Sequence, residues 1–335
     1  KRHSYDSARA SFERAIAFDS SFAMAYYYLW FYAPDNTCER LLQQALDHSE
    51  QSDVRSRFFI RSHAYRMDRK WGEAIRELEG VLELYPDDVE ALIGIGSLER
   101  IMGRFETSVE HLQRAVQVDS LNSDGYNELA ATLSVLGRYA EALGVIDKSI
   151  DLEPENANLV DSKGDILAQL GMWDSARVVF GKALEIDSAI TPARYHLIQL
   201  HLLMGYPDSA LDHITYLRRY GPLNYPSLAA YLEAVAAVRA GRFRDALRLA
   251  DDGIARDQDN DLLGLKLRKL FLKATVLLEI DSLDEALAIL DRCDMIGRTI
   301  RPDDKLGYNT YRAQFLARAG RLEKAAEIAE RIRLD

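Results

Sequence analysis

Residues 123–154 read SDGYNELAATLSVLGRYAEALGVIDKSIDLEP, and they contain two amphipathic segments separated by a glycine. Each segment repeats its apolar and small residues at three- and four-residue spacing, which is typical of one face of a helix. The first stripe consists of Tyr126, Leu129, Ala130 and Leu133, and the second of Tyr139, Ala142, Ile146 and Ser149. Gly137 suits the end of the first helix and Pro154 ends the second. The stretch therefore predicts a helix–turn–helix hairpin.

The same signals return along the chain at a period of 34 residues or twice that distance. Glycines stand at 103, 137, 171 and 205, and small residues stand at Ala74, Ser108, Ala142, Ala176 and Ala210. Pro86, Pro154 and Pro222 are spaced by 68 residues. A fixed period of this length is the sequence signature of a repeat protein, in which each hairpin buries its apolar faces against its neighbours.

The residues of these units resemble the tetratricopeptide repeat (TPR) family. Residues 55–88 carry the pattern as Phe58, Tyr65, Trp71, Ala74, Leu78 and Pro86; residues 89–122 as Leu92, Gly96, Phe105 and Ala115; residues 157–190 as Gly164, Leu167, Trp173, Ala176, Phe180 and Ala183; and residues 191–224 as Leu197, Ala210, Ile214 and Pro222. The resemblance implies an all-α fold, a right-handed α-solenoid of tandem hairpins. It also implies binding of other proteins rather than catalysis.

We expect residues 1–335 to form one solenoid with regular 34-residue repeats at 55–224. Residues 1–50 are expected to hold divergent repeats, the first of them truncated, and 227–335 three further repeats with insertions near 222–226, 261–266 and 301–305. Terminal repeats of a solenoid need a polar cap, and none is evident at either end. The segment is therefore expected to be cut from a longer protein, or else to self-associate through its ends. If a transmembrane helix precedes the segment, the repeats could lie outside the cytoplasm. If the chain is free-standing, it is expected in the cytoplasm.

Composition narrows the partners. With 42 basic and 53 acidic residues, the net charge of −11 disfavours nucleic-acid binding and is compatible with a basic protein partner. No run of about 18 apolar residues predicts a membrane span. The two cysteines, Cys38 and Cys293, are far apart in the sequence and are expected to be reduced thiols without a catalytic or metal-binding role.

Catalytic, cofactor and metal motifs are not recognisable, so no enzyme activity, cofactor or metal is expected. Gly94 and Gly96 lie inside a predicted helix and are explained by close packing rather than by a dinucleotide loop. Asp257, Asp259 and Asp261 have the opening spacing of a calcium-binding loop, but Leu262 and Arg268 stand where that loop needs glycine and glutamate. His196 and His201 are five residues apart, which does not place them on one helical face.

The resemblance implies that a peptide or partner protein binds on the first helix of each repeat, which lines the concave side in the family. The candidates near the N-terminus are Tyr27, Phe59, His63 and Arg66; those in the centre are Asn127, Glu128, Asp161 and Asp165; and those further along are Tyr195, His196, Gln199, Tyr231 and Phe271. They suit a basic partner or one with aromatic or aliphatic anchors. For each residue, the alternative is packing against the neighbouring helix.

One subtype of the family is disfavoured. Chaperone-binding members clamp an acidic C-terminal tail with Lys, Asn and Arg, whereas the corresponding places here hold Phe59, His63, Gly94 and Asn127. An alternative role follows from residues 55–96, which look like TPR regions of bacterial serine/threonine kinases, cyclases or transcription regulators. In that case the repeats would be a sensory or docking module of a larger signalling protein.

Overall fold

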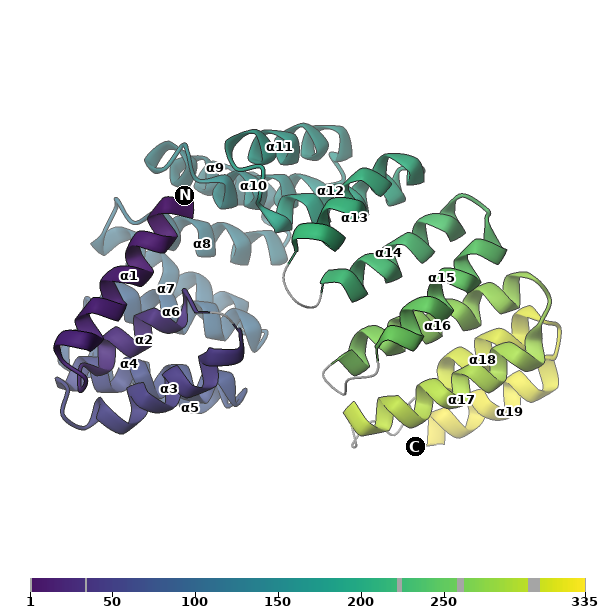
Figure 1. The fold of residues 1–335 in the computed structure, drawn as a ribbon, viewed down its shortest axis with the longest axis horizontal. Coiled ribbons are helices and arrows are strands. Elements are labelled where there is room, and N and C mark those ends of the chain that lie inside the picture. The colour runs from purple at the N-terminus through teal and green to yellow at the C-terminus, as the bar shows by residue number, and fades with distance from the viewer. Residues whose placement is uncertain (1, 34, 222–224, 258–261, 301–307, 335) are drawn as a thin grey trace. The chain divides into compact units, whose positions relative to one another are not determined.

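A computed structural model describes residues 2–33, 35–221, 225–257, 262–300 and 308–334 as a series of helices joined by short turns (Figure 1). Every regular element within these ranges is an α-helix, which confirms the all-α prediction. The helices are α1 (Arg2–Phe18), α2 (Ala23–Trp30), α3 (Asp35–Ser49), α4 (Val54–Met67), α5 (Trp71–Leu84), α6 (Val89–Ile101), α7 (Phe105–Val118), α8 (Ser123–Val135), α9 (Tyr139–Leu152), α10 (Ala157–Gln169), α11 (Trp173–Ile186), α12 (Thr191–Leu203), α13 (Pro207–Tyr220), α14 (Tyr225–Arg239), α15 (Phe243–Arg256), α16 (Leu263–Glu279), α17 (Leu283–Ile300), α18 (Asn309–Arg318) and α19 (Leu322–Leu334).

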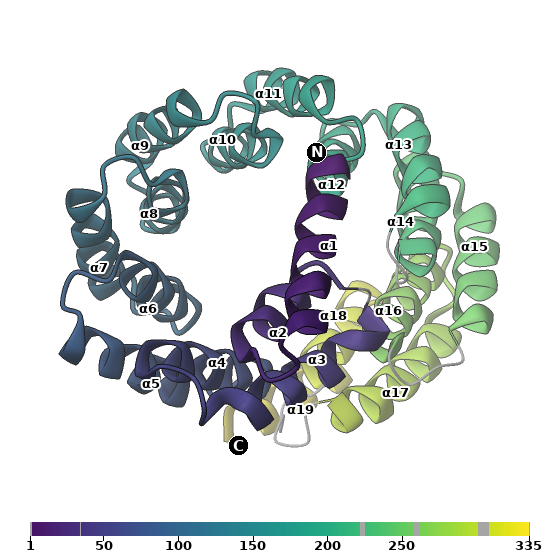
Figure 2. The same ribbon diagram turned by 60° about the vertical axis from the view of Figure 1, so that its left-hand side comes forward.

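The helices are grouped into two compact units, Lys1–Gly171 and Met172–Asp335. In the first unit, the helices follow a curve, with α6, α8 and α10 on its inner side and α7 and α9 on its outer side (Figure 2). In the second unit, α12, α14 and α16 take the inner side and α13, α15 and α17 the outer side (Figure 2). We call these two sides the inner and outer faces of each unit. The predicted first helices of the repeats thus form the inner faces.

The three predicted insertions lie wholly or partly outside the described residues. Residues 301–305 lie outside the described residues, and 222–226 and 261–266 are described only in part. The helices between the last two of these points, α16 and α17, have 17 and 18 residues, whereas α6 to α13 have 13 or 14.

Glycines with a left-handed backbone form the turn inside most of the hairpins. Gly137 has φ +73°, and its N–H donates to the carbonyl of Ser134 at 2.9 Å. The next residue, Arg138, donates to the carbonyl of Leu133 at 2.9 Å. This pair of bonds satisfies carbonyls that the helix end leaves unpaired, and it requires the left-handed backbone that glycine tolerates best. Arg69 occupies the same place in the 34-residue register without glycine, at φ 58°.

Replacing Gly137 by alanine is expected to lower the free energy of unfolding by about 1–2 kcal/mol, because an L-residue pays that much to adopt the left-handed conformation. Nothing lies within 4 Å of a Cβ built at Gly137, so the cost is conformational rather than steric. Gly144, within α9, is the matched control. It also has nothing within 4 Å, and Gly144→Ala is expected to stabilise by about 0.5–1 kcal/mol. Urea denaturation of both variants measures the difference, and equal effects would contradict this explanation.

The small residues of the register are buried wherever the helices of a hairpin meet. Ala74, Ser108, Ala142, Ala176 and Ala210 are each 0% exposed. Ser108 satisfies its buried hydroxyl by donating to the carbonyl of Gly96 at 2.7 Å. Because these side chains are small, the two helix backbones can approach closely, as the sequence indicated.

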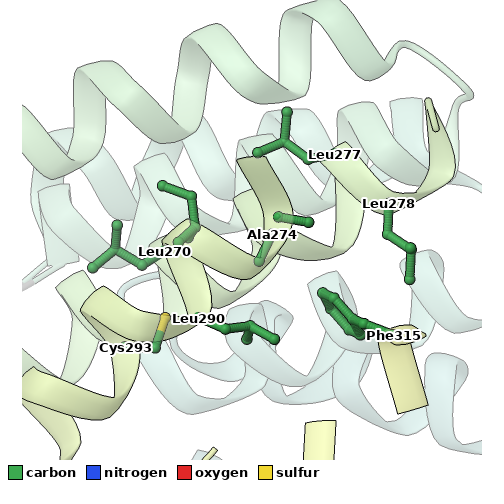
Figure 3. Packing of buried hydrophobic residues seen from close by; sticks show 9 residues of the cluster. Leu270, Ala274, Leu277, Leu278, Leu290, Cys293 and Phe315 are labelled. Atoms are coloured by element: carbon green, nitrogen blue, oxygen red, sulfur yellow. The ribbon is translucent and has the colours of Figure 1, made fainter. Parts of the chain in front are cut away.

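The second unit contains an apolar cluster formed by α16, α17 and α18 (Figure 3). Leu270 and Ala274 of α16 lie against Leu290 and Cys293 of α17, and Phe315 of α18 completes the cluster (Figure 3). Burial raises the pKa of the Cys293 thiol to about 12, so it stays protonated at neutral pH and acts as a core residue.

Candidate binding surface

Aromatic side chains of α2 and of Phe31, the residue that follows it, surround His63 of α4 in the first unit. The imidazole ring centre lies 4.4 Å from the ring of Trp30, 5.5 Å from that of Tyr27 and 5.4 Å from that of Phe31. His63 is 3% exposed, while Phe31 at the edge is 48% exposed. The packing of α2 against α4 therefore places a polar ring inside an apolar box that opens on one side.

A small hollow adjoins this box. Its volume is about 220 Å³. It is lined by Tyr27, Phe31, Phe59, Ser62, His63, Arg66, Leu78, Glu90, Ile93, Gly94 and Ser97, and we call it the aromatic hollow. All four of the candidates predicted near the N-terminus line it, although Tyr27, Phe59 and His63 are largely covered by neighbouring helices.

The imidazole of His63 is neutral and unsatisfied. Burial, followed by the nearby Arg66, lowers its pKa to about 4, so at pH 7 one ring nitrogen is a donor and the other an acceptor. Neither nitrogen has a hydrogen-bond partner among the described residues. A buried polar group without a partner costs about 1–3 kcal/mol of stability, which makes its presence here notable.

A second hollow, of about 600 Å³, lies beside the first and shares Glu90 and Ile93 with it. We call it the acidic hollow. Its lining consists of Arg55, Asp87, Asp88, Val89, Glu90, Ile93, Asn122 and Asp124. Arg55 donates to Asp88 at 2.6 Å and to Glu90 at 2.9 Å, and its guanidinium also covers the ring of Phe59 at 4.5 Å. Arg114 donates to Asp87 at 3.1 Å. Three of the four carboxylates therefore have an arginine partner, and the fourth is Asp124.

Asp124 gives the acidic hollow an uncompensated charge. It has no ion-pair partner among the described residues. Its side chain is exposed, but the protein around it partly desolvates the carboxylate, and this desolvation together with the negative Glu153 and Glu128 raises its pKa. A carboxylate in this position is stabilised by any cation that approaches it.

Of the candidates predicted in the centre of the first unit, Glu128 and Asp165 are hydrogen-bonded within the chain. Glu128 accepts hydrogen bonds from Ser97 at 2.8 Å and from Arg100 at 2.9 Å, and Asp165 accepts one from Gln169 at 2.8 Å. Asp161 is 7% exposed. Asn127 is half-buried, and its side-chain oxygen has no partner.

The remaining candidates belong to the second unit. Tyr195 and Tyr231 pack on the core of α12, α13 and α14, and burial raises the pKa of Tyr231. His196 lies 5.0 Å from the ring of Phe180, and Gln199 is exposed. Phe271 packs against Tyr311 at 4.5 Å. The structure therefore brings the four N-terminal candidates together in one hollow, and it places the others elsewhere.

Several residues of the two hollows were missed in the sequence. Phe31 of the aromatic hollow belongs to the aromatic run AMAYYYLWFY, whose density of rings was a signal for a packed cluster. Arg55 and Glu90 carried no such signal, because a charged residue in a helical repeat is most often solvated.

Comparison with known proteins agrees with this architecture. The pattern of the family described as tetratricopeptide repeat matches residues 61–124, 98–158 and 231–295, and a second pattern of the same description matches 310–331, together more than half of the chain. The chain is a tetratricopeptide-repeat protein. Proteins of this family are helical scaffolds that typically mediate protein–protein interactions.

Similar proteins include a tetratricopeptide repeat protein from Parabacteroides merdae. Its crystal structure shares 15% identity at a TM-score of 0.58, over 80% of this TPR chain and 99% of that one. The TPR repeat-containing thioredoxin TTL4 of Arabidopsis thaliana is 27% identical over 36% of this chain and 17% of its own length. The Hsp70-Hsp90 organizing protein of Triticum aestivum is 32% identical over 25% of this chain and 15% of its own length. The TPR chain spans less than a quarter of the length of the curated relatives it matches.

No helix in the described residues of this TPR protein has the length and apolar character needed to cross a membrane. Within the same residues, no three histidine, cysteine, aspartate or glutamate side chains are grouped so that they could hold a metal ion. Of the three aspartates spaced as in a calcium-binding loop, Asp259 and Asp261 lie outside the described residues. Asp257 forms a salt bridge with Lys269.

Proposed function

We propose that the chain is a non-catalytic scaffold that binds a peptide or a partner protein on the inner face of its first unit. The observation that carries the proposal is the pair of adjoining hollows over α2, α4, α6 and α8, which contain unsatisfied polar groups that a partner would satisfy. Aromatic walls beside such groups are the composition found at binding hot spots. The carboxylates of the acidic hollow favour a basic partner, and so does the net charge of −11.

Charge reversal at Asp124 tests this surface. A peptide selected from an array of unbiased sequences with the full chain is expected to bind Asp124→Lys at least about tenfold more weakly, because a favourable charge contact becomes a repulsive one. Asp124 is a surface residue in the first turn of α8, so the fold is expected to persist. The affinity is measured by fluorescence polarisation at two salt concentrations.

Glu110→Lys is the matched control, because Glu110 is an exposed carboxylate on α7, on the outer face. It changes the net charge by the same amount and is expected to leave the affinity within about twofold, as a distant charge is screened at physiological salt. Equal losses in both variants, or no loss in Asp124→Lys, would place the binding surface elsewhere.

The alternative role, a sensory or docking module of a larger bacterial kinase, cyclase or transcription regulator, would use the same surface. It stays a prediction from residues 55–96. The sequence encoded on either side of the chain tests it directly, since a neighbouring catalytic or DNA-binding domain is its requirement.

A further inference from the structure

The inference concerns the partner of the aromatic hollow and rests on the proposed function. His63 is the unusual feature, since it is 3% exposed and both of its ring nitrogens lack partners. A buried, unsatisfied imidazole is destabilising in the chain alone, and each such group in a native protein calls for an explanation. A ligand group that enters the aromatic hollow and bonds to His63 supplies one.

The size of the aromatic hollow limits what can enter it. At about 220 Å³ it is smaller than a typical small-molecule or cofactor site, which measures about 300–1,000 Å³. It is suited to one large side chain. The walls formed by Tyr27, Phe31 and Phe59 favour an aromatic side chain, which would pack edge-to-face or offset against them.

A charged side chain is disfavoured in the aromatic hollow. A cation would meet Arg66, and the face of Phe59 is already covered by the guanidinium of Arg55 at 4.5 Å. An anion would meet Glu90. A neutral group that both donates and accepts a hydrogen bond fits either tautomer of His63, and the phenol hydroxyl is such a group.

The acidic hollow defines the neighbouring position of the partner. It shares Glu90 and Ile93 with the aromatic hollow, so a single segment can occupy both. Its four carboxylates are balanced by only two arginines, Arg55 and Arg114, and Asp124 has no ion-pair partner among the described residues. A lysine or arginine is the complementary side chain.

We infer that the first unit binds a segment carrying a tyrosine, inserted beside His63 in the aromatic hollow, next to a lysine or arginine in the acidic hollow. In this arrangement His63 acts as a specificity residue. It bonds to the phenol hydroxyl and thereby distinguishes tyrosine from phenylalanine.

A positional-scanning library of acetylated and amidated dodecapeptides, assayed with the full chain by fluorescence polarisation, tests the inference. The expected selection is tyrosine at one position and lysine or arginine close to it. In the best peptide, tyrosine→phenylalanine is expected to weaken binding about 5–30-fold, because His63 is left unpaired. Replacing the basic residue by glutamate is expected to weaken it about tenfold or more.

His63→Leu separates a specific contact from a structural role. The variant is expected to melt about 2–4 °C higher than the parent chain, because an unsatisfied polar group is removed from an apolar box. It is also expected to lose the preference for tyrosine over phenylalanine. A merely structural histidine would leave that preference unchanged, which would overturn the inference.

Phe31→Ala provides a second variant that keeps the core intact, since Phe31 is 48% exposed. It removes a wall of the aromatic hollow and is expected to weaken the tyrosine peptide about tenfold. Selection of peptides without an aromatic residue, but still sensitive to Asp124→Lys, would overturn this inference and leave the proposed function standing. Selected peptides insensitive to Asp124→Lys would overturn both.

Discussion

Asp257→Ala is expected to lower the free energy of unfolding of the second unit by about 3–5 kcal/mol, because it leaves a buried lysine without its counter-ion. Lys269 is 0% exposed and Asp257 2% exposed, and their charged groups are 2.5 Å apart. Ser227 accepts from Lys269 at 2.7 Å and donates to Asp257 at 2.8 Å. The three residues link α14, the C-terminal end of α15 and α16, so the loss affects the packing of three helices.

The destabilisation of Asp257→Ala is expected to depend on pH with a defined sign. Burial lowers the pKa of Lys269 even in the parent chain, although Asp257 opposes this effect. Without Asp257 the folded pKa falls further below that of the unfolded chain, so the folded variant binds fewer protons at neutral to alkaline pH. Its free energy of unfolding therefore rises with pH until the unfolded lysine also loses its proton, at about pH 10.4.

Asp251→Ala is the control, since Asp251 and Lys273 form an ion pair between the same two helices, at 2.6 Å, but on the surface. Its loss is expected to cost at most about 1 kcal/mol. The double replacement Asp257→Leu with Lys269→Met is expected to cost less than Asp257→Ala, because it removes both buried charges. Urea denaturation gives the magnitudes, and hydrogen exchange of α14–α16 gives the location. Equal costs for Asp257→Ala and Asp251→Ala would contradict the assignment.

The second large effect is expected at Leu112, which is 0% exposed and is packed against Gly96. Leu112→Ala removes buried methyl groups and leaves a cavity, so it is expected to cost about 2–5 kcal/mol. Gly96→Ala is expected to be unfavourable as well, by up to about 3 kcal/mol. A Cβ built at Gly96 would lie 2.6 Å from the Leu112 Cγ, which is too close to be accommodated without movement of α6 or α7.

The two substitutions are expected to compensate each other. With Leu112→Ala in place, the new methyl group of Gly96→Ala has room and adds helix propensity of about 1 kcal/mol. The double variant should therefore be more stable than Leu112→Ala alone. A double-mutant cycle from urea denaturation measures this coupling. Strict additivity of the two costs would show that Gly96 does not accommodate Leu112, and that the glycine needs another explanation.

The repeat architecture was predictable from the sequence because its determinants are local and periodic. Gly137 ends α8 through hydrogen bonds to residues at most five positions away, and Ala142 meets a helix that is adjacent in the sequence. Each such signal is repeated at 34 residues, so the pattern can be recognised even where a single position departs from it. Arg69 is such a departure, since it adopts the left-handed backbone without being a glycine.

The candidate site was predictable only in part, because it depends on how successive repeats are packed. Tyr27, Phe59, His63 and Arg66 were selected as residues of first helices, and they do line one hollow. Asp161 was selected by the same rule, yet it lines neither hollow. The same repeat position therefore has different surroundings in different repeats, because its neighbours come from other helices.

What the sequence alone determined is the helical repeat, its register and the small residues at the close contacts, since these follow from spacing along one chain segment. What only the tertiary structure decided is the environment of individual polar residues. His63 is unpaired inside an aromatic box, and Lys269 is paired with Asp257 in the core. Both are single polar residues within helical segments, and their neighbours come from other helices. Burial and pairing are properties of the packed helices, so the sequence pattern could not distinguish these residues from solvated ones.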